Sequence, residues 1–391
     1  MQTLADFYEL MEKTTTLRRM LVGYYFAGSV KLEEVSGLRN ACEALEETKT
    51  DDGHHEFLVK QGGRKTQIAL DYEIDELEKD LFFFEHGEDA LYRYVADRVP
   101  DLQAQMSAVQ DLLRPTQDAA FITDRDGTVN NYCGRYRSSV QSAYNAILLA
   151  RFARSRAKTP VVLTSAPLED FGLLDLTTMP DKAFLLAGSK GREFRDLQGH
   201  RHEAPVDPEK GRRLVELNSR ISALLEEPEF EEFGLIGSAV QYKLGETTVA
   251  RQDMYGSVAN ERSEDFLERI RKLVAELDPD GETFRIEDTG YDIEIVLTRD
   301  EGDRDFNKGD GIDFIDAQIG LGLDGPAVVC GDTSSDVPMV ERVGRTSTDL
   351  RSIFVTTDDE LKRRVASAAP QSVFVDSPDV LVLALGALAK E

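Results

Sequence analysis

At 391 residues the chain is longer than one compact core usually is, so two or three domains are expected. Its 73 acidic residues against 46 basic ones give a net charge of −27, which repels nucleic acids and anionic membranes. Both a halophilic source and an ordinary acidic surface would explain this charge. Three distant cysteines and the lack of a membrane-length apolar stretch lead us to expect a cytoplasmic protein that contacts neither nucleic acid nor membrane. The composition leaves the oligomeric state open.

The first 115 residues predict a mostly helical accessory domain. Apolar residues recur at helical spacing over 4–21, and a long amphipathic stretch covers 88–113. Between them, apolar runs on either side of Gln61-Gly-Gly-Arg64 predict a β-hairpin. This part carries no catalytic motif, and its purpose is open at this point.

From residue 119 onward, strands alternate with helices, which predicts a Rossmann-like core with a parallel α/β sheet. The apolar runs that predict its strands are 119–123, 159–164, 182–187 and 325–330. Residues 136–157 carry apolar side chains at helical spacing and predict the first crossover helix. Each predicted strand ends in polar residues, which is where open parallel sheets bind their ligands.

An insertion with a different pattern interrupts this core. Its predicted helices lie near 208–225 and 264–277, and its strand-like runs are 234–242, 247–251 and the segments around 284 and 293. We interpret residues 192–300 as an inserted α+β cap domain. The core then consists of residues 116–191 and 301–391.

Two carboxylates follow the first predicted strand, in Phe121-Ile-Thr-Asp124-Arg-Asp126-Gly127-Thr128. Asp124 can attack phosphorus as a nucleophile. Asp126 can protonate the leaving oxygen and later deprotonate a water molecule. An ordinary polar turn would contain the same residues, so the other motifs of the chain have to decide between the two interpretations.

Three further motifs supply what phosphoryl transfer needs. Thr164, or its neighbour Ser165, ends the second strand and can donate a hydroxyl hydrogen bond to phosphate. Lys308 supplies a cation that can also pair with the nucleophile. In Gly331-Asp332-Thr-Ser-Ser-Asp336, Asp332 can reach a metal ion, and Asp336 can orient that ligand or contact the metal itself.

In this order, the motifs resemble those of the haloacid dehalogenase superfamily of aspartate-based phosphatases. The resemblance implies a nucleophile at Asp124 and an acid/base at Asp126. It implies phosphate binding by Thr164 or Ser165 and by Lys308. It also implies Mg²⁺ as the cofactor, with metal-binding residues Asp124, Asp126 (through its backbone carbonyl), Asp332 and Asp336.

The position of the insertion narrows the family. Roughly 140 residues separate Thr164 from Lys308, which places the cap in the second insertion position. This arrangement resembles the branch of trehalose-6-phosphate, sucrose-6-phosphate and mannosyl-3-phosphoglycerate phosphatases and phosphomannomutases. Short segments after the third core strand and in the cap resemble the trehalose-6-phosphate phosphatases, and they imply substrate binding by Lys190, Lys243, Arg251 and Glu294. One departure is Thr333, where that family usually has a second acid.

The sequence therefore predicts a Mg²⁺-dependent phosphatase that hydrolyses trehalose 6-phosphate or a similar glycosyl phosphate through an aspartyl-phosphate. Such a reaction would serve osmolyte synthesis. Two alternatives stay open: a phosphosugar mutase of the same fold, and a phosphatase of sucrose phosphate or of a glycosyl-glycerol or glycerate phosphate. The sequence does not show where the cap side chains that would select the sugar lie in space.

Overall fold

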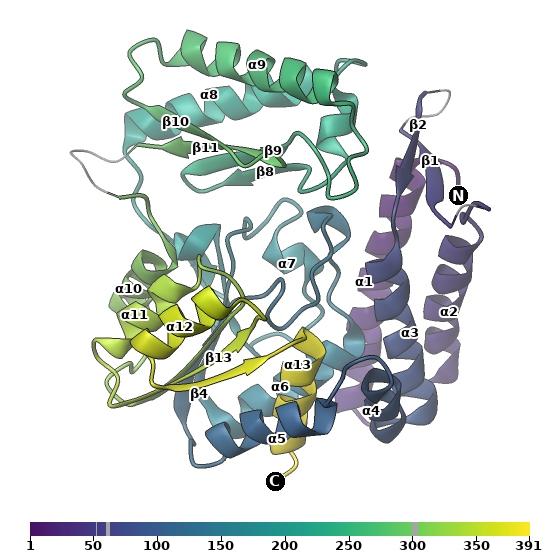
Figure 1. Cartoon of the computed structure of the whole chain (residues 1–391), viewed down its shortest axis with the longest axis vertical. Helices are drawn as coiled ribbons and strands as arrows, with labels where there is room; N and C mark the ends of the chain where they lie inside the picture. Colours follow the sequence, from purple (N-terminus) through teal and green to yellow (C-terminus); the bar gives the residue numbers. More distant parts are fainter. Residues whose placement is uncertain (52, 60–62, 299–303) are drawn as a thin grey trace.

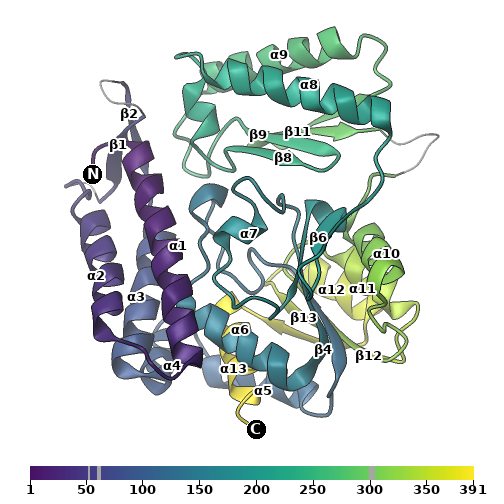
Figure 2. The same cartoon turned by 180° about the vertical axis from the view of Figure 1, so that it is seen from behind.

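The computed structural model describes residues 1–51, 53–59, 63–298 and 304–391. They form a helical bundle, a core built on a large sheet, and a smaller α+β cap. In Figure 1 the cap lies above the core and the bundle lies along one side of it. Figure 2 shows the same arrangement from behind. Within the described ranges, no helix combines the length and the apolarity needed to cross a membrane.

The core sheet has the strand order β14-β13-β12-β3-β4-β5-β6-β7. Its strands are β3 (Ala119–Thr123), β4 (Ala157–Leu163), β5 (Leu185–Gly188), β6 (Glu193–Arg195), β7 (Arg201–Glu203), β12 (Pro326–Gly331), β13 (Asp349–Val355) and β14 (Gln371–Val375). Neighbouring strands from β14 to β5 are parallel, and β6 and β7 extend the sheet as antiparallel strands. The predicted Rossmann-like parallel core is confirmed.

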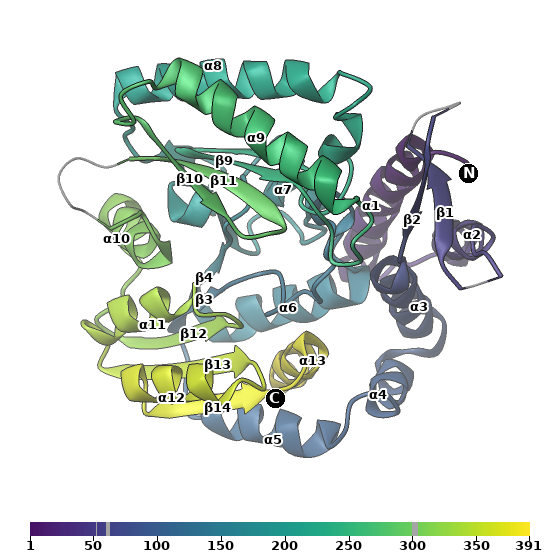
Figure 3. The same cartoon turned by 45° about the horizontal axis from the view of Figure 1, so that its top comes forward.

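Both faces of the parallel sheet are covered, which explains why its strands are apolar throughout. On β3, Phe121 packs into one apolar cluster, while Ala120 and Ile122 pack into a second cluster on the opposite face. The helices over the first face are α5 (Leu102–Leu113), α6 (Ala143–Arg156) and α13 (Pro378–Leu388). Those over the second face are α10 (Lys308–Ile319), α11 (Val337–Gly344) and α12 (Asp359–Ala368). Figure 3 shows the sheet between these two layers.

The N-terminal bundle contains α1 (Leu4–Phe26), α2 (Leu32–Glu46), α3 (Asp71–His86) and α4 (Glu88–Ala96). Strands β1 (His55–Leu58) and β2 (Lys65–Ile68) pair antiparallel, which confirms the predicted hairpin. Part of its predicted turn, Gln61-Gly62, lies outside the described residues. The amphipathic stretch 88–113 divides near Pro100 into α4 and α5, because proline interrupts a helix. Since α5 packs on the core sheet, the bundle ends before residue 115.

The cap has its own antiparallel sheet, in the order β10-β11-β9-β8, with α8 and α9 packed on it. Its elements are α8 (Pro208–Leu225), β8 (Val240–Lys243), β9 (Glu246–Ala250), α9 (Asn260–Leu277), β10 (Phe284–Asp288) and β11 (Asp292–Leu297). The first residues of the predicted cap, 192–203, instead pair with the edge of the core sheet as β6 and β7. The separate cap sheet therefore begins later than the composition indicated.

Three predicted element boundaries are wrong, because apolar residues extend beyond the regular backbone. The strand expected from residue 182 begins at Leu185, since Lys182 has a left-handed φ of +63°. The helix expected from residue 136 begins at Ala143, after a 3-10 turn η1 (Tyr136–Ser138). The strand expected from residue 234 begins at Val240, after the turn η3 (Glu231–Gly234).

Candidate active site

The ends of three neighbouring parallel strands and the start of α10 bring the catalytic candidates together. Asp124 follows β3, Thr164 follows β4 and Asp332 follows β12, while Lys308 is the first residue of α10. The Asp124 carboxylate is buried and accepts a hydrogen bond from the Lys308 ammonium at 2.5 Å. The backbone N–H of Asp124 donates to the Cys330 carbonyl at 3.0 Å, which holds the residue beside β12.

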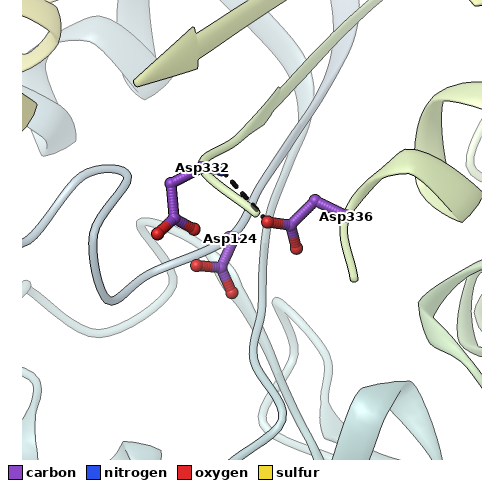
Figure 4. Close-up of side chains that lie close together, drawn as sticks. All are labelled: Asp124, Asp332 and Asp336. Atoms are coloured by element: carbon purple, nitrogen blue, oxygen red, sulfur yellow. Dashed lines mark hydrogen bonds between the residues drawn. The ribbon is translucent and has the colours of Figure 1, made fainter. Parts of the chain in front are cut away.

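Three carboxylates form a cluster at this edge of the sheet (Figure 4). One oxygen from each of Asp124, Asp332 and Asp336 lies within 4.8 Å of the other two. Asp336 is already fully engaged: one oxygen accepts from Lys308 at 2.6 Å, and the other accepts from the backbone N–H groups of Asp332 and Thr333 at 3.1 and 3.0 Å. Asp336 therefore orients its neighbours, while Asp124 and Asp332 offer oxygens toward the cavity.

The charge of this cluster suits a divalent cation. Burial, together with the neighbouring carboxylates, raises the pKa of Asp124 to about 7 and that of Asp332 to about 9, although Lys308 opposes both shifts. Burial works against ionisation of Asp336 too, but Lys308 and the backbone donors hold its pKa below the ordinary value. Three carboxylates against one ammonium leave an excess of negative charge, and oxygen donors are those that Mg²⁺ prefers. The donor set thus fits such an ion.

The loop after the nucleophile passes directly against Asp332. A Cβ atom at Gly127 would lie 2.1 Å from Asp332 Oδ2, and Gly127 has a φ of +85°. Only glycine fits both constraints. The Thr128 hydroxyl lies 3.3 Å from Asp124 Oδ2 and 3.2 Å from Asp332 Oδ1, so it can donate to either carboxylate. Gly127 and Thr128 of the motif therefore help to position Asp124 and Asp332.

The acid/base candidate Asp126 lies on the same loop. Its Oδ1 accepts a hydrogen bond from the Ser139 hydroxyl at 2.8 Å and another from the Arg125 guanidinium. Arg125 is buried and also donates to the hydroxyl and the carbonyl oxygen of Ser139. Ser139 and Arg125, which are not part of the carboxylate cluster, thus hold Asp126 beside the cavity.

A cavity of about 530 Å³ lies over these residues, between core and cap. Six predicted site residues line it: Asp124, Asp126, Thr164, Ser165, Lys308 and Asp332. Thr164 and Ser165 both reach its wall, so either hydroxyl can serve a phosphate there. The cavity is larger than a phosphate ion alone needs, and its wall combines the Thr164 and Ser165 hydroxyls and the Lys308 ammonium with side chains of the cap.

The four predicted substrate residues are not among those that line this cavity. Lys190 and Lys243 instead pair with the two oxygens of Glu246, at 2.7 and 2.6 Å. Arg251 pairs with Glu264 at 2.8 Å and with Asp288 at 3.2 Å. Burial raises the pKa of Glu294, and the carboxylate of Glu246 adds to the effect. Their role in substrate binding stays a prediction.

Other residues, which the sequence did not predict as site residues, form the rest of the cavity wall. They are Tyr132, Cys133, Gly134, Tyr136, Ser139 and Ala166 from the core, Gly237, Ser238, Gln241, Gln252, Asp253, Met254, Thr289, Tyr291 and Asp292 from the cap side, and Thr333 and Ser335 after β12. Tyr132 and Tyr291 are more than half exposed, although tyrosine usually buries its ring. The one sequence signal that could have identified Tyr132 and Tyr291 is an aromatic residue in a turn rich in Gly, Asn or Asp.

Comparisons with known proteins match both parts of this architecture. Residues 121–381 match the family "Trehalose-6-phosphate phosphatase, C-terminal", and residues 3–102 match "Trehalose-6-phosphate phosphatase N-terminal helical bundle domain". The chain belongs to the trehalose-6-phosphate phosphatase family. This confirms the family expected from the motifs, and it shows that the N-terminal bundle is a part of the family's architecture.

Individual relatives are more distant. The chain is 35% identical to alpha,alpha-trehalose-phosphate synthase [UDP-forming] 2 of Caenorhabditis elegans, over all of this chain and 33% of that protein. It thus spans about a third of the length of that relative. It is 28% identical to the trehalose-phosphatase of Caenorhabditis briggsae, over 97% of this chain and 95% of that one. The C-terminal domain of C. albicans trehalose-6-phosphate phosphatase is similar in structure, with a TM-score of 0.48 and 13% identity over 73% of this chain and 96% of that chain.

Proposed function

We propose that this chain is a Mg²⁺-dependent phosphatase that hydrolyses trehalose 6-phosphate in osmolyte synthesis, through an aspartyl-phosphate on Asp124. The observation that carries the proposal is the Asp124 carboxylate, buried beside Lys308 and Asp332 at the bottom of the cavity under the cap. Membership of the trehalose-6-phosphate phosphatase family supports this choice of substrate.

The reaction follows from the placement of the chain's own side chains. A carboxylate oxygen of Asp124 attacks phosphorus, and the bond from phosphorus to the sugar oxygen breaks while Asp126 gives that oxygen its proton. Lys308 and the Thr164 or Ser165 hydroxyl hold the phosphoryl oxygens. A water molecule then attacks the phosphorus of the aspartyl-phosphate as Asp126 takes its proton, and phosphate and the free Asp124 carboxylate result.

The acidic cluster would hold the metal ion in this reaction. Asp124 and Asp332 would be its side-chain ligands, with Asp336 orienting them and Asp126 contributing its backbone carbonyl. Such an ion would supply positive charge to the phosphate and to the carboxylates around it. Binding it requires that Asp124 and Asp332 lose their protons, so ion and protons compete for the same oxygens.

Release of phosphate from trehalose 6-phosphate, with and without Mg²⁺, tests the proposal. We expect turnover with Mg²⁺, little without it, and a loss of at least about 1,000-fold in Asp124→Asn, since no other group can form the covalent intermediate. The matched control Asp111→Asn removes an exposed carboxylate far from the site and should keep full activity. No hydrolysis of this or any other sugar phosphate by the Mg²⁺-loaded protein would refute the proposal, and an isomerised sugar phosphate without free phosphate would indicate a mutase.

A further inference from the structure

The loop that carries Asp126 has little regular structure of its own. Residues 124–142 connect β3 to α6, and within them the described backbone forms the short turn η1 and a single bridge between Asp126 and Asn130. The same loop contributes Tyr132, Cys133, Gly134, Tyr136 and Ser139 to the wall of the cavity. Side-chain contacts must therefore fix its conformation.

Those contacts come from one face of α3, in the N-terminal bundle. The Glu73 carboxylate is fully buried and accepts from the Arg135 guanidinium at 2.8 and 3.0 Å and from the Ser138 hydroxyl at 2.6 Å. One turn further along, the buried Glu76 accepts from the Asn131 amide at 2.8 Å. Residues three apart on a helix share a face, so α3 presents both acids to the loop.

Tyr72 extends this contact to the acid/base residue itself. Its hydroxyl donates to the Val140 carbonyl at 2.9 Å and accepts from the Asn130 amide at 3.0 Å. The Asn130 amide also donates to the Ser139 hydroxyl at 3.2 Å, and that hydroxyl donates to Asp126 at 2.8 Å. The Asn130 amide also lies 3.1 Å from the Asn131 carbonyl, so its two hydrogens serve three acceptors and one of them is shared. Three hydrogen bonds thus connect α3 to the carboxylate.

We propose that Tyr72 is a positioning residue for Asp126, and that the N-terminal bundle thereby takes part in leaving-group protonation. The inference rests on the proposed function. It gives the bundle a role in catalysis, although none of its residues lines the cavity among those described. Burial raises the pKa of the Tyr72 phenol well above its ordinary value, which keeps the hydroxyl available as a donor.

If Tyr72 positions Asp126, the rate lost on its substitution should depend on the leaving group of the substrate. A sugar alkoxide is a strongly basic leaving group and needs the proton of Asp126 as its bond to phosphorus breaks. An aryl phosphate such as p-nitrophenyl phosphate releases a weakly basic phenolate, which needs little protonation. A displaced Asp126 therefore slows the first substrate more than the second. A merely structural defect lowers the amount of active enzyme and slows both equally.

The test compares kcat/KM of Tyr72→Phe for trehalose 6-phosphate and for p-nitrophenyl phosphate. This ratio excludes the later hydrolysis of the aspartyl-phosphate, in which Asp126 acts alike whichever substrate was used. We expect a loss of about tenfold with the sugar phosphate, a part of the roughly 100- to 10,000-fold that a general acid contributes, and a loss below about twofold with the aryl phosphate. Tyr94→Phe is the matched control, because its hydroxyl bonds to Glu78 within the bundle at 2.6 Å. The control should leave the ratio of the two rates unchanged.

The outcomes separate the two proposals. A wild-type protein that hydrolyses neither substrate would refute the proposed function, and this inference with it. An active wild type whose Tyr72→Phe variant keeps the ratio of the two rates would overturn the positioning role alone. If that variant does not fold, Asn130→Ala interrupts the same connection from the side of the loop. An unchanged ratio in Asn130→Ala would equally overturn the inference.

Discussion

The N-terminal bundle contacts the core through buried charged side chains, whereas the cap contacts the core through a few polar groups. At the bundle, Lys79 of α3 pairs with Glu76 and with Asp379 at the start of α13, the latter at 3.0 Å. Nearby, Arg18 of α1 pairs with Asp80 at 2.6 Å, and Asp80 accepts from a backbone N–H of α6. All these charged groups are buried, and among them Asp379 is the most exposed at 8%.

At the cap, the Tyr136 N–H of the core loop donates to the Gly237 carbonyl at 3.3 Å, and further contacts lie at the turn between β8 and β9. Lys190 of the core pairs with Glu246, and the Leu244 N–H donates to the Ser189 hydroxyl at 3.0 Å. Arg192 donates to the Leu244 carbonyl at 3.2 Å. The cap also contacts the bundle, where the Tyr8 hydroxyl donates to the Leu235 carbonyl and Arg64 pairs with Glu232. We therefore expect the β8–β9 hairpin of the cap to open from the core more readily than the bundle does, because its polar contacts with the core are less buried than the ion pairs of the bundle.

Removal of one buried charge at the bundle should have the largest effect. Although burial opposes its charge, Asp379 and Glu76 hold the pKa of Lys79 well above the ordinary value. Lys79→Met leaves these buried acids without a cationic partner, and we expect a loss of about 3 to 5 kcal/mol in the free energy of unfolding, measured by urea titration. Lys65→Met removes an ammonium that is 66% exposed and pairs with Glu56, so it should cost less than about 1 kcal/mol. Similar losses of unfolding free energy in Lys79→Met and Lys65→Met would contradict the importance of the buried ion pairs at the bundle.

The acidic cluster between these two contacts should respond to Mg²⁺ in a pH-dependent way. Because the folded-state pKa values of Asp124 and Asp332 are about 7 and about 9, above 3.8, the ion-free folded protein binds more protons than the unfolded chain. Its stability therefore falls as the pH rises from roughly 4 to 9. Bound Mg²⁺ removes this penalty, and at 100 times its Kd a ligand adds about 2.7 kcal/mol.

Thermal unfolding at about pH 6 and about pH 8.5, with Mg²⁺ and with a chelator, measures this effect. Because protons compete with the ion, a fixed Mg²⁺ concentration should raise Tm more at the higher pH. Asp332→Asn removes one ligand and should abolish most of the rise. An equal rise at both pH values would show that these two carboxylates do not bind the ion.

Removal of a charge at the contact between the cap hairpin and the core should have the smallest effect. Glu246 is buried, yet Lys243 and Lys190 lower its pKa to about 2. Glu246→Gln keeps the shape but removes the ionic attraction, so opening of the cap hairpin should become easier by about 1 kcal/mol, or roughly fivefold in local hydrogen exchange. Exchange at Leu244 should rise while exchange in α3 stays constant. The control Glu264→Gln removes an exposed acid of α9 that pairs with Arg251. It should leave exchange at Leu244 unchanged. Faster exchange in α3 would mean that bundle and cap are not independent.

The positions of the candidate catalytic residues could be predicted because they follow from a local rule. Asp124 and Asp332 each come directly after an apolar strand, and parallel strands end at the same edge of the sheet. The bond between Lys308 and Asp124 also follows from the order of the motifs. By contrast, Lys190 and Lys243 were predicted as substrate residues, and their pairing with Glu246 could not be foreseen. A cation's partner depends on which side chains of distant segments approach it, and no spacing in the chain encodes that.

The sequence by itself determined the fold class and indicated the set of candidate phosphoryl-transfer residues and the place of the cap insertion. These features depend on periodicity and on residues adjacent to strand ends, which are local properties. Only the tertiary structure decided that α5 belongs to the core, that β6 and β7 extend the core sheet, and that α3 supports the loop of Asp126. Those features arise from packing between segments far apart in the chain, where burial and charge pairing select among many surfaces that look alike in sequence.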